Sequence, residues 1–410
     1  MPVPAAFDVA IAGASIGGCT AARLFALAGA RVALVERKPD PAAYKVVCTH
    51  QIQSSAVPTI ERLGLAPPLE RTGAVRSRAA AWTPYGGWFQ IPPDVPPGYG
   101  ITRRSLDPIV RELALGTEGV EYFPGETVAG LLGGRSRVEG VETRRSDRRR
   151  HTIDARLTVA ADGRDSTIAR LARVPARVRP HNRFAYFAYW RGVRTPQDEA
   201  RLWMLDPDAA AVFPNEGGIT LIAVVPHRAR LAEFRADPEA AYGRMIGALP
   251  DGPELGDAER VSKLVSKLEL PNKMRPAARP GLAFVGDAAL ATDPLFGVGC
   301  GWAFQSAEWL VEETHSALLD DGDLDVALDR YRRAFRRRLG PHHMQIADYS
   351  TGRPMRLNER LAFRAAASDP VVGAALEEFT TRRGTVLRMF DPRLLARVLR
   401  PASGRAAGRS

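Results

Sequence analysis

The sequence predicts an α/β protein in which a parallel-sheet unit carries a strand-rich insertion and is followed by a helical C-terminal segment. Residues 7–36 have the pattern of a strand, a glycine-containing turn, a helix and a second strand. Residues 184–225 contain several strand-like runs, and the chain after residue 325 has helical patterns. A chain of 410 residues is also long for one compact core, so we expect more than one packed unit.

The first unit is predicted in three steps. FDVAIA at residues 7–12 is a short apolar run rich in β-formers, which is typical of a buried parallel strand. Small and apolar residues from Cys19 to Ala30 predict a helix that Gly29 closes. Residues 31–35 predict a second buried strand, which ends at Glu36. A β–turn–α–β unit of about 30 residues is the context in which a dinucleotide-binding fingerprint is meaningful.

The remaining elements follow from periodicity and turn signals. We expect helices over Ser54–Leu65, over Leu106–Leu115 and from about Trp302, strands and turns over Trp82–Tyr99, a meander over 120–160 with a turn at Ser146-Asp147, a hairpin turn over Asn215–Gly218, and a buried strand over 282–285.

Charge and cysteine usage exclude several classes of protein. The net charge is +11, but only five of the 57 basic residues are lysine, and the arginines are spread along the chain. This pattern is typical of a compositional bias, so we expect no nucleic-acid binding. Cys19, Cys48 and Cys300 are too few and too far apart for a disulfide framework. No apolar run reaches about 18 residues, and the N-terminus lacks a basic signal region. We expect a cytoplasmic protein without membrane insertion.

The first motif is Gly13-x-Ser15-x-x-Gly18, between the first strand and the helix. Its glycines permit a tight turn and close helix–strand contact, and the helix N-terminus attracts a pyrophosphate. Glu36 lies 18 residues beyond Gly18, at the end of the second strand, where a carboxylate can accept the hydroxyls of a ribose. The motif therefore predicts dinucleotide binding, although a glycine-rich turn can also be purely structural.

Two further motifs also follow buried strands. ADGRDS at residues 161–166 follows LTVA, and GDAA at 286–289 follows LAFV. Asp287, at a strand end, can bond a ribityl or ribose hydroxyl. DPLFGVGCG at 293–301 opens a helix, where backbone N–H groups can face an electron-rich ring edge.

In this order the three motifs resemble the flavoprotein monooxygenase superfamily of the aromatic-hydroxylase type, which also contains flavin-dependent halogenases and geranylgeranyl reductases. The resemblance covers residues 7–340 and implies a Rossmann-like FAD-binding domain of the glutathione-reductase/aromatic-hydroxylase type with an inserted mixed β-sheet substrate domain and a helical C-terminal segment. Together with the motifs, it predicts that FAD is bound by Gly13, Ser15, Gly18, Glu36, Arg37, Arg103, Val128, Asp162, Gly286, Asp287, Pro294, Gly297, Gly299 and Cys300.

The same resemblance predicts a division of the chain. The discontinuous FAD-binding domain is expected to comprise residues 1–75, 100–175 and 277–340, the substrate-binding sheet domain residues 76–99 and 176–276, and the helical segment residues 341–410.

The implied activity is hydroxylation of an aromatic or polyketide-like small molecule through a flavin C4a-hydroperoxide, with NAD(P)H as electron donor. No second nucleotide fingerprint is present, so NAD(P)H docks transiently or a separate flavin reductase supplies reduced flavin. This chemistry requires no protein nucleophile, and we assign no catalytic residue. The substrate is expected against strand aromatics and their neighbours, above all Phe184, Tyr186, Phe213 and Pro214, from a wider set that includes Phe187, Tyr189, Trp190 and Trp203.

Departures from the hydroxylase pattern leave other members of the superfamily open. Leu290 stands where the family's GDAAH motif ends in histidine, and Gly301 stands where its G-Q-G-x-N loop ends in asparagine. An FAD-dependent oxidase, dehydrogenase or geranylgeranyl-reductase-like enzyme is therefore the alternative. A halogenase is less expected, because both aromatic positions of its W-x-W-x-I-P stretch are alanine here and the chain has no lysine between Lys45 and Lys263. A non-catalytic FAD-binding protein is the last alternative.

The segment Lys45–His50 resembles the cysteine-bearing segment of prenyl reductases. Cys48–His50 is interpreted as a loop near the flavin face, with a plain structural loop as the alternative. No second Cys/His pair completes a metal site, so we expect no metal. His342-His343 is interpreted as surface. The oligomeric state stays open.

Overall fold

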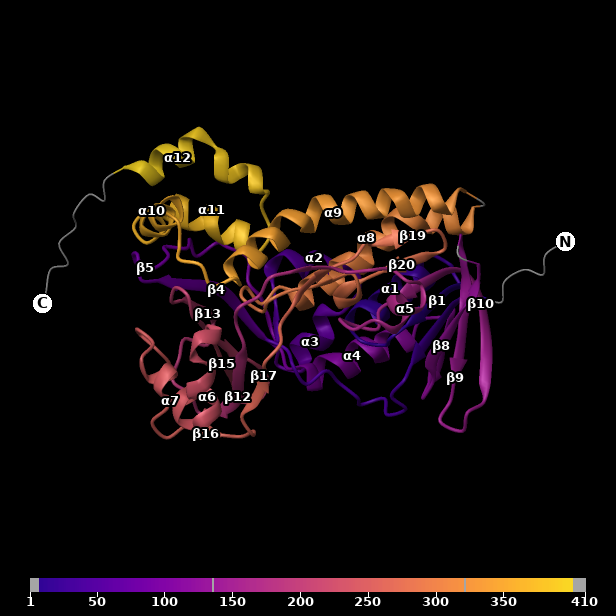
Figure 1. Ribbon diagram of the computed structural model, residues 1–410, viewed down its shortest axis with the longest axis horizontal. Coiled ribbons are helices and arrows are strands. Elements are labelled where there is room, and N and C mark those ends of the chain that lie inside the picture. Colours follow the sequence, from indigo (N-terminus) through magenta and orange to yellow (C-terminus); the bar gives the residue numbers. More distant parts are fainter. Residues whose placement is uncertain (1–6, 135, 321, 401–410) are drawn as a thin grey trace, which may run out of the picture.

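Three β-sheets organise the computed structural model, which describes residues 7–134, 136–320 and 322–400 (Figure 1). The first sheet has eight strands: β19 (Ala278–Arg279), β20 (Leu282–Phe284), β10 (Arg150–Ala160), β1 (Phe7–Ala12), β2 (Val32–Glu36) and β7 (Val120–Pro124) in this order, with β8 (Thr127–Gly133) and β9 (Val138–Arg144) paired to β10 through β9. This mixed architecture confirms the predicted fold class.

The centre of this sheet is parallel, and this arrangement brings the three motifs together. β1 pairs in parallel with β2 and β10, and β10 pairs in parallel with β20. The turns at Gly13, Ala161 and Gly286 directly follow β1, β10 and the strand end at Val285. Because parallel strands end at the same edge of a sheet, the three turns meet at one edge.

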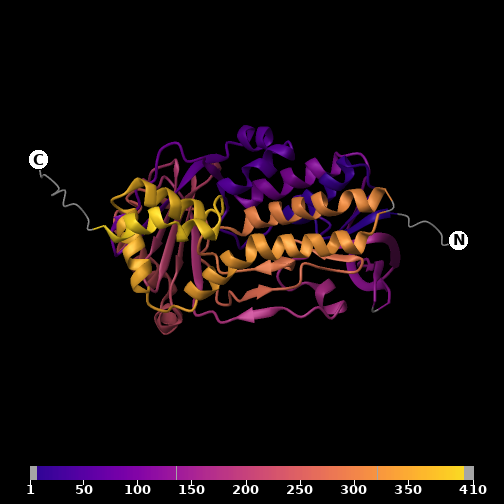
Figure 2. The ribbon, with the colours of Figure 1, turned by 90° about the horizontal axis from the view of Figure 1, so that it is seen from above.

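Helices cover this sheet in layers. α1 packs against both α4 and α8, and α8 and α9 lie side by side along the molecule (Figure 2). The helices of the first 320 residues are α1 (Ile16–Leu27), α2 (Val57–Arg62), α3 (Ala66–Arg71), α4 (Arg103–Leu115), α5 (Thr167–Leu171), α6 (Leu231–Ala236), α7 (Pro238–Gly247) and α8 (Gly299–Leu319), with the short 3-10 turns η1 (Ser54–Ala56), η2 (Glu216–Gly218), η3 (Arg228–Arg230) and η4 (Gly286–Ala288).

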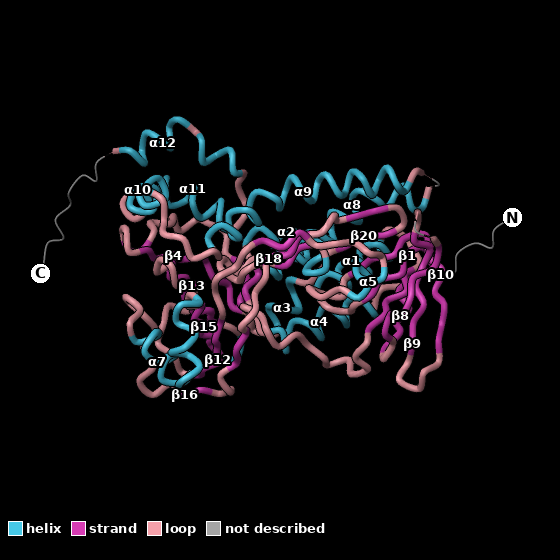
Figure 3. Tube along the Cα trace, in the orientation of Figure 1, coloured by secondary structure: helices cyan, strands magenta, loops and turns pink. Residues whose placement is uncertain are grey.

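The second sheet has ten strands: β16 (Glu259–Arg260), β12 (Ala185–Arg191), β15 (Ile219–Val225), β14 (Ala209–Pro214), β13 (Glu199–Met204), β4 (Val75–Thr83), β6 (Gly98–Gly100) and β3 (Gln51–Ile52) in order, with β17 (Val265–Lys267) on β12 and β5 (Gly87–Trp88) on β4. Figure 3 shows β4, β12, β13 and β15 of this sheet at the other end of the molecule from β1, β8, β9 and β10 of the first sheet. The predicted hairpin turn over Asn215–Gly218 joins β14 to β15, whose register pairs Pro214 with Thr220. A small third sheet contains β11 (Arg177–Arg179), β18 (Asn272–Met274) and β21 (Leu290–Ala291).

The described part of the chain ends in helices. α9 (Leu324–Tyr349) is followed by α10 (Leu357–Ala366), α11 (Pro370–Thr380), the 3-10 turn η5 (Val386–Phe390) and α12 (Pro392–Leu399), drawn in yellow in Figure 1. No helix among the described residues is long and apolar enough to cross a membrane. The predicted division into domains stays a prediction.

Some element boundaries differ from those predicted. The helix expected over Ser54–Leu65 is split into η1 and α2, because Pro58 has no N–H to continue one ladder of hydrogen bonds. α1 and α8 begin at Ile16 and Gly299, each three residues before the predicted start. In both places the glycines belong to the first helical turn, although the sequence pattern was typical of a loop.

Candidate active site

A cavity of about 660 Å³ is shared by the motif turns and the ten-stranded sheet. One part of its wall is the edge of the first sheet, where the motifs meet. The opposite part consists of residues on β12 to β15. Every predicted cofactor residue except Gly18 lines the cavity: Gly13, Ser15, Glu36, Arg37, Arg103, Val128, Asp162, Gly286, Asp287, Pro294, Gly297, Gly299 and Cys300. Their contact with FAD stays a prediction.

The first turn requires glycine for steric reasons. Gly13 has φ +106°, and a Cβ there would lie 2.5 Å from the carbonyl oxygen of Ala161. A Cβ on Gly18 would lie 1.7 Å from the carbonyl oxygen of Gly13. Gly18 therefore lies behind the turn, where its lack of a side chain lets α1 pack directly against the turn. Ser15 is the N-cap residue, but its side chain does not cap the helix, so the first N–H groups of α1 are available to an anion.

Glu36 connects the turn to the end of β2. Its Oε2 accepts a hydrogen bond from the Ala14 N–H at 2.8 Å, and its Oε1 accepts one from the Lys38 N–H at 2.9 Å. Each carboxylate oxygen retains a lone pair that can accept a ribose hydroxyl. Arg37 and Val128 line the same cavity.

Arg103 is held under the turn by a buried ion pair. Its Nη2 lies 2.6 Å from Oδ1 of Asp107 and donates to the Ser15 hydroxyl at 2.5 Å. The exposed fractions of the two side chains are 4% and 1%. Burial acts to lower the pKa of Arg103, but the charges of Asp107 and Cys48 outweigh it and raise the pKa. The family resemblance implied Arg103, whereas its pairing with Asp107, four residues further along α4, was not predicted.

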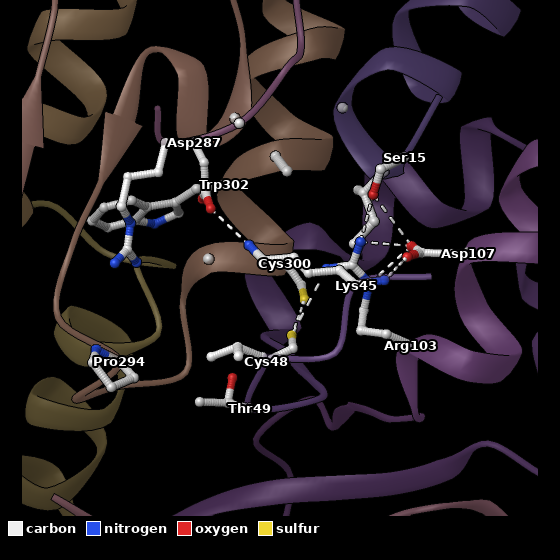
Figure 4. Close-up of a pocket in the computed structure, with 18 of the residues that line it drawn as sticks. Ser15, Lys45, Cys48, Thr49, Arg103, Asp107, Asp287, Pro294, Cys300 and Trp302 are labelled. Atoms are coloured by element: carbon white, nitrogen blue, oxygen red, sulfur yellow. Dashed lines mark hydrogen bonds and ion pairs between the residues drawn. The ribbon is translucent and has the colours of Figure 1, made fainter. Parts of the chain in front are cut away.

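Lys45 and Asp287 form an ion pair at the cavity wall, shown in Figure 4. Nζ of Lys45 lies 2.7 Å from Oδ2 of Asp287. The attraction raises the pKa of Lys45 and, against the effect of burial, lowers the pKa of Asp287. Both side chains stay partly exposed, at 45% and 22%. Asp287 is therefore an ionised hydrogen-bond acceptor at the strand end where the motif predicted one.

Cys48 and Cys300 point toward one another in the same cavity (Figure 4). Their sulfur atoms are 3.4 Å apart, although the residues are 252 positions apart in the chain. The hydrogen bond between them lowers the pKa of Cys48 and raises the pKa of Cys300. The His50 N–H at 3.4 Å and Nη1 of Arg103 at 3.9 Å also donate to Cys48 Sγ. The two sulfurs are therefore one hydrogen-bonded unit, in which the Cys300 thiol favours negative charge on Cys48.

His50 holds the cysteine loop in position. It has φ +59°, which is strained for a residue other than glycine. Its Nδ1 accepts a hydrogen bond from the Arg103 N–H at 2.8 Å, so Nε2 carries the proton and donates to the Tyr189 hydroxyl at 2.5 Å. Burial lowers the pKa of His50 and keeps the ring neutral. The Cys48–His50 loop thus lies beside the cavity, and these hydrogen bonds tie it to Arg103 and Tyr189.

Four predicted substrate residues do not line the cavity, and this prediction is corrected. Phe184 and Tyr186 face the opposite side of the sheet, where they pack with Phe234 of α6. Strand alternation explains the error, since Ala185 and Phe187, one residue along, do line the cavity.

The other two lie on the cavity side of the sheet or at its end. Phe213 is buried in an apolar cluster with Leu221, and the carbonyl of Pro214 faces Gly100, so neither reaches the cavity. Of the wider aromatic set, Phe187 lines it, and Tyr189, Trp190 and Trp203 do not.

The wall on the ten-stranded sheet consists of small and apolar side chains. They are Ala185, Phe187, Leu202, Ala209, Ala210, Ala211, Leu221, Ala223 and Val225. Alanine at five of these positions leaves space above the strands, which an apolar molecule can occupy. Two of these alanines, Ala209 and Ala211, stand at the aromatic positions of the halogenase W-x-W-x-I-P stretch.

Several buried polar groups were not predicted. Asp293 lines the cavity and is fully buried, and burial raises the pKa of its carboxyl group. His181 Nε2 lies 3.8 Å from Asp293 Oδ2, and burial lowers the pKa of His181 to about 4. The interpretation of His342 and His343 as surface residues is wrong. Both are buried in α9, and burial lowers the pKa of each to about 4. Among the described residues no cluster of three or more acidic, histidine or cysteine side chains is suited to a metal ion.

Comparison with known proteins identifies the cofactor class. Residues 6–340 match the family described as FAD binding domain. The chain belongs to this family. The FAD-dependent monooxygenase superfamily suggested by the motifs is thereby confirmed, and the protein is an FAD-dependent oxidoreductase.

Relatives come from several branches of the superfamily. The chain is 28% identical to digeranylgeranylglycerophospholipid reductase 2 of Methanopyrus kandleri, over 80% of this chain and 81% of that protein. It is 25% identical to tryptophan 2-halogenase of Chondromyces crocatus, over 82% of this chain and 66% of that protein. Among solved structures, a flavin-dependent brominase has a TM-score of 0.78 at 18% identity, covering 92% of this chain and 93% of that chain. These structural likenesses show the fold.

The residues at the cavity fit FAD. The open N-terminus of α1 suits the pyrophosphate, Glu36 suits the adenosine ribose, and Asp287 suits a ribityl hydroxyl. Oδ1 of Asp162 is buried without a hydrogen-bond partner among the described residues, as expected of a group that a bound molecule satisfies. Gly299 and Cys300 lie in the first turn of α8 at the cavity wall, where backbone N–H groups would suit the ring edge.

Proposed function

We propose that the protein is an FAD-dependent reductase that saturates a carbon–carbon double bond in an apolar, isoprenoid-like substrate. The Cys48–Cys300 pair carries this proposal, because it holds a transferable proton in the wall of a cavity whose other side is apolar. Bound reduced FAD supplies the hydride, and saturation of the bond needs one proton in addition. The geranylgeranyl-reductase-like alternative from the sequence is therefore favoured over hydroxylation.

The chain's own residues fulfil three tasks in this proposal. The two sulfurs, 3.4 Å apart, hold the proton as one unit, and we assign the donor to the pair and not to either sulfur alone. Arg103 and the His50 N–H stabilise the thiolate that remains. The alanine-rich wall excludes water and accommodates a hydrocarbon chain. NAD(P)H, directly or through a flavin reductase, is the proposed source of electrons.

The relatives support the substrate class. Several of the curated relatives are digeranylgeranylglycerophospholipid reductases, and their names describe isoprenoid lipids.

Hydroxylation of an aromatic substrate is the second candidate. Phe187 in the cavity wall can stack on an aromatic ring, which favours it. Two thiols beside an oxygen-activating flavin are readily oxidised, which argues against it.

Anaerobic turnover tests the proposal. Protein reconstituted with FAD and reduced with dithionite is mixed with geranylgeraniol or geranylgeranyl diphosphate in D₂O. Products heavier by two hydrogens, both of them deuterium because the N–H groups of reduced flavin and the thiols exchange with D₂O, support the reductase. Products that form only in air and take ¹⁸O from O₂ would establish the hydroxylase instead.

Variants assign the proton donor. Cys48→Ala and Cys300→Ala are expected to lower turnover by about 10²-fold or more while FAD is retained. Cys19→Ala is the matched control, since Cys19 is also buried but lies in α1 outside the cavity wall. Equal turnover of all three variants and the wild type would exclude the cysteine pair as donor.

A further inference from the structure

Large exposed apolar side chains gather in the C-terminal helices. Leu387 and Phe390 on η5 are 79% and 67% exposed, and Leu399 on α12 is 71% exposed. With Leu395, which is also exposed, these residues define the C-terminal apolar patch. Large exposed apolar side chains are normal singly, but a group within thirteen residues indicates an interaction site.

The local geometry places these side chains outward while α12 stays anchored. Leu387 and Phe390 are three residues apart in a 3-10 turn and share one side of it. On α12, Leu394 and Val398 are buried against the other C-terminal helices. Leu395 and Leu399, one position further along, form a second apolar stripe that lies outside this contact. In Figure 1 α12 lies at the outer margin of the molecule.

Basic residues accompany the patch. Residues 351–400 contain ten arginines, five acidic residues and no lysine. Arg397 pairs with Asp369 and Arg388 with Glu378, whereas Arg393 and Arg400 are exposed and have no ion-pair partner among the described residues. Along the exposed face of α12, Arg393 and Arg397 lie at one edge, and Leu395 and Leu399 lie at the other.

We propose that η5 and α12 dock on an anionic lipid surface. An interfacial helix of this kind inserts its apolar side chains at the headgroup boundary, and its arginines bind the phosphates. Arg393 and Arg400, unpaired in the described part of the chain, also favour lipid phosphates over a second copy of the chain, because the same patch on that copy carries the same two unpaired arginines. This docking involves no membrane-spanning helix and does not depend on the proposed reductase activity.

Sedimentation with vesicles tests the proposal on the full chain loaded with FAD. We expect the protein to sediment with vesicles of phosphatidylcholine and phosphatidylglycerol about tenfold more tightly than with phosphatidylcholine alone, and to be released by salt. Leu387→Ser/Phe390→Ser should abolish the binding, and Arg393→Gln/Arg400→Gln should weaken it on anionic vesicles.

Matched controls keep the test specific. Leu27→Ser/Val326→Ser removes two exposed apolar side chains outside the patch, and Arg149→Gln removes an exposed arginine in the β9–β10 hairpin loop; both should bind as the wild type does. Retained FAD absorbance shows that each variant is folded. The proposal is overturned if the wild type does not bind anionic vesicles or if the patch variants bind them as the wild type does. It is also overturned if the protein forms a dimer without lipid and the patch variants abolish that dimer.

Discussion

The two sides of the cavity are built on different principles. On the nucleotide side, backbone turns and paired charges define the shape: Gly18 touches Gly13, and Arg103 pairs with Asp107. On the sheet side, small apolar side chains such as Ala211 define the shape by leaving space. We therefore expect few substitutions on the nucleotide side to preserve FAD binding, whereas substitutions on the sheet side should change which substrates fit.

The largest expected effect lies in the nucleotide turn. Gly18→Asp should abolish FAD retention, because its Cβ would clash with the Gly13 carbonyl and force the turn out of the shape that suits a pyrophosphate. Gly243→Ala in α7 is the control, since an added Cβ there meets nothing within 4 Å. Absorbance near 450 nm of the purified proteins measures the outcome. A yellow Gly18→Asp protein at wild-type stoichiometry would contradict the assignment of the turn.

Breaking the buried ion pair should have the next largest effect. Asp107→Asn leaves Arg103 buried without a full counter-charge and should lower the free energy of unfolding by about 3 kcal/mol. Asp198→Asn, which removes the partner of Arg78 at the surface, should cost less than about 1 kcal/mol. Urea denaturation of both variants gives the difference. Equal losses would show that burial does not distinguish the two pairs.

Substitutions on the two faces of the ten-stranded sheet sharpen the comparison. Ala211→Leu projects into the cavity and should raise KM about tenfold with FAD retention unchanged. Ala188→Leu on the opposite face meets the packed core beneath α6 and α7, and should lower stability by about 1–3 kcal/mol. Steady-state kinetics and thermal unfolding separate the two effects. The assignment of faces is wrong if Ala188→Leu changes KM and Ala211→Leu does not.

The smallest effect concerns the cysteines at the junction. The hydrogen bond with Cys300 lowers the pKa of Cys48, so Cys48 should ionise at lower pH than an ordinary thiol. Iodoacetamide at neutral pH should alkylate Cys48 first. Cys19, whose pKa is raised by burial, should stay unmodified. Mass spectrometry of peptides identifies the modified residue, and preferential labelling of Cys19 would refute the prediction.

Prediction from sequence succeeded where a motif depends on its own backbone. The strands at residues 7–12 and 282–285 and the turn at Gly13 were found because local sterics and apolar runs specify them. It failed for the substrate wall, since aromatic side chains on β12 alternate between two faces and the sequence does not state which face is inward. The error at Phe184 and Tyr186 is therefore an error of register and not of secondary structure.

The sequence by itself predicted dinucleotide binding, because the spacing of Gly13, Gly18 and Glu36 follows from the short-range geometry of one β–α–β unit, and the resemblance of its ordered motifs to a flavoprotein family added FAD. Only the tertiary structure brought Cys48 to Cys300, Lys45 to Asp287 and His50 to Tyr189. Each of these contacts joins residues more than a hundred positions apart. Such pairs form because loops, strands and a helix N-terminus from distant parts of the chain meet at one cavity and beside it, and no local pattern in the chain records that convergence.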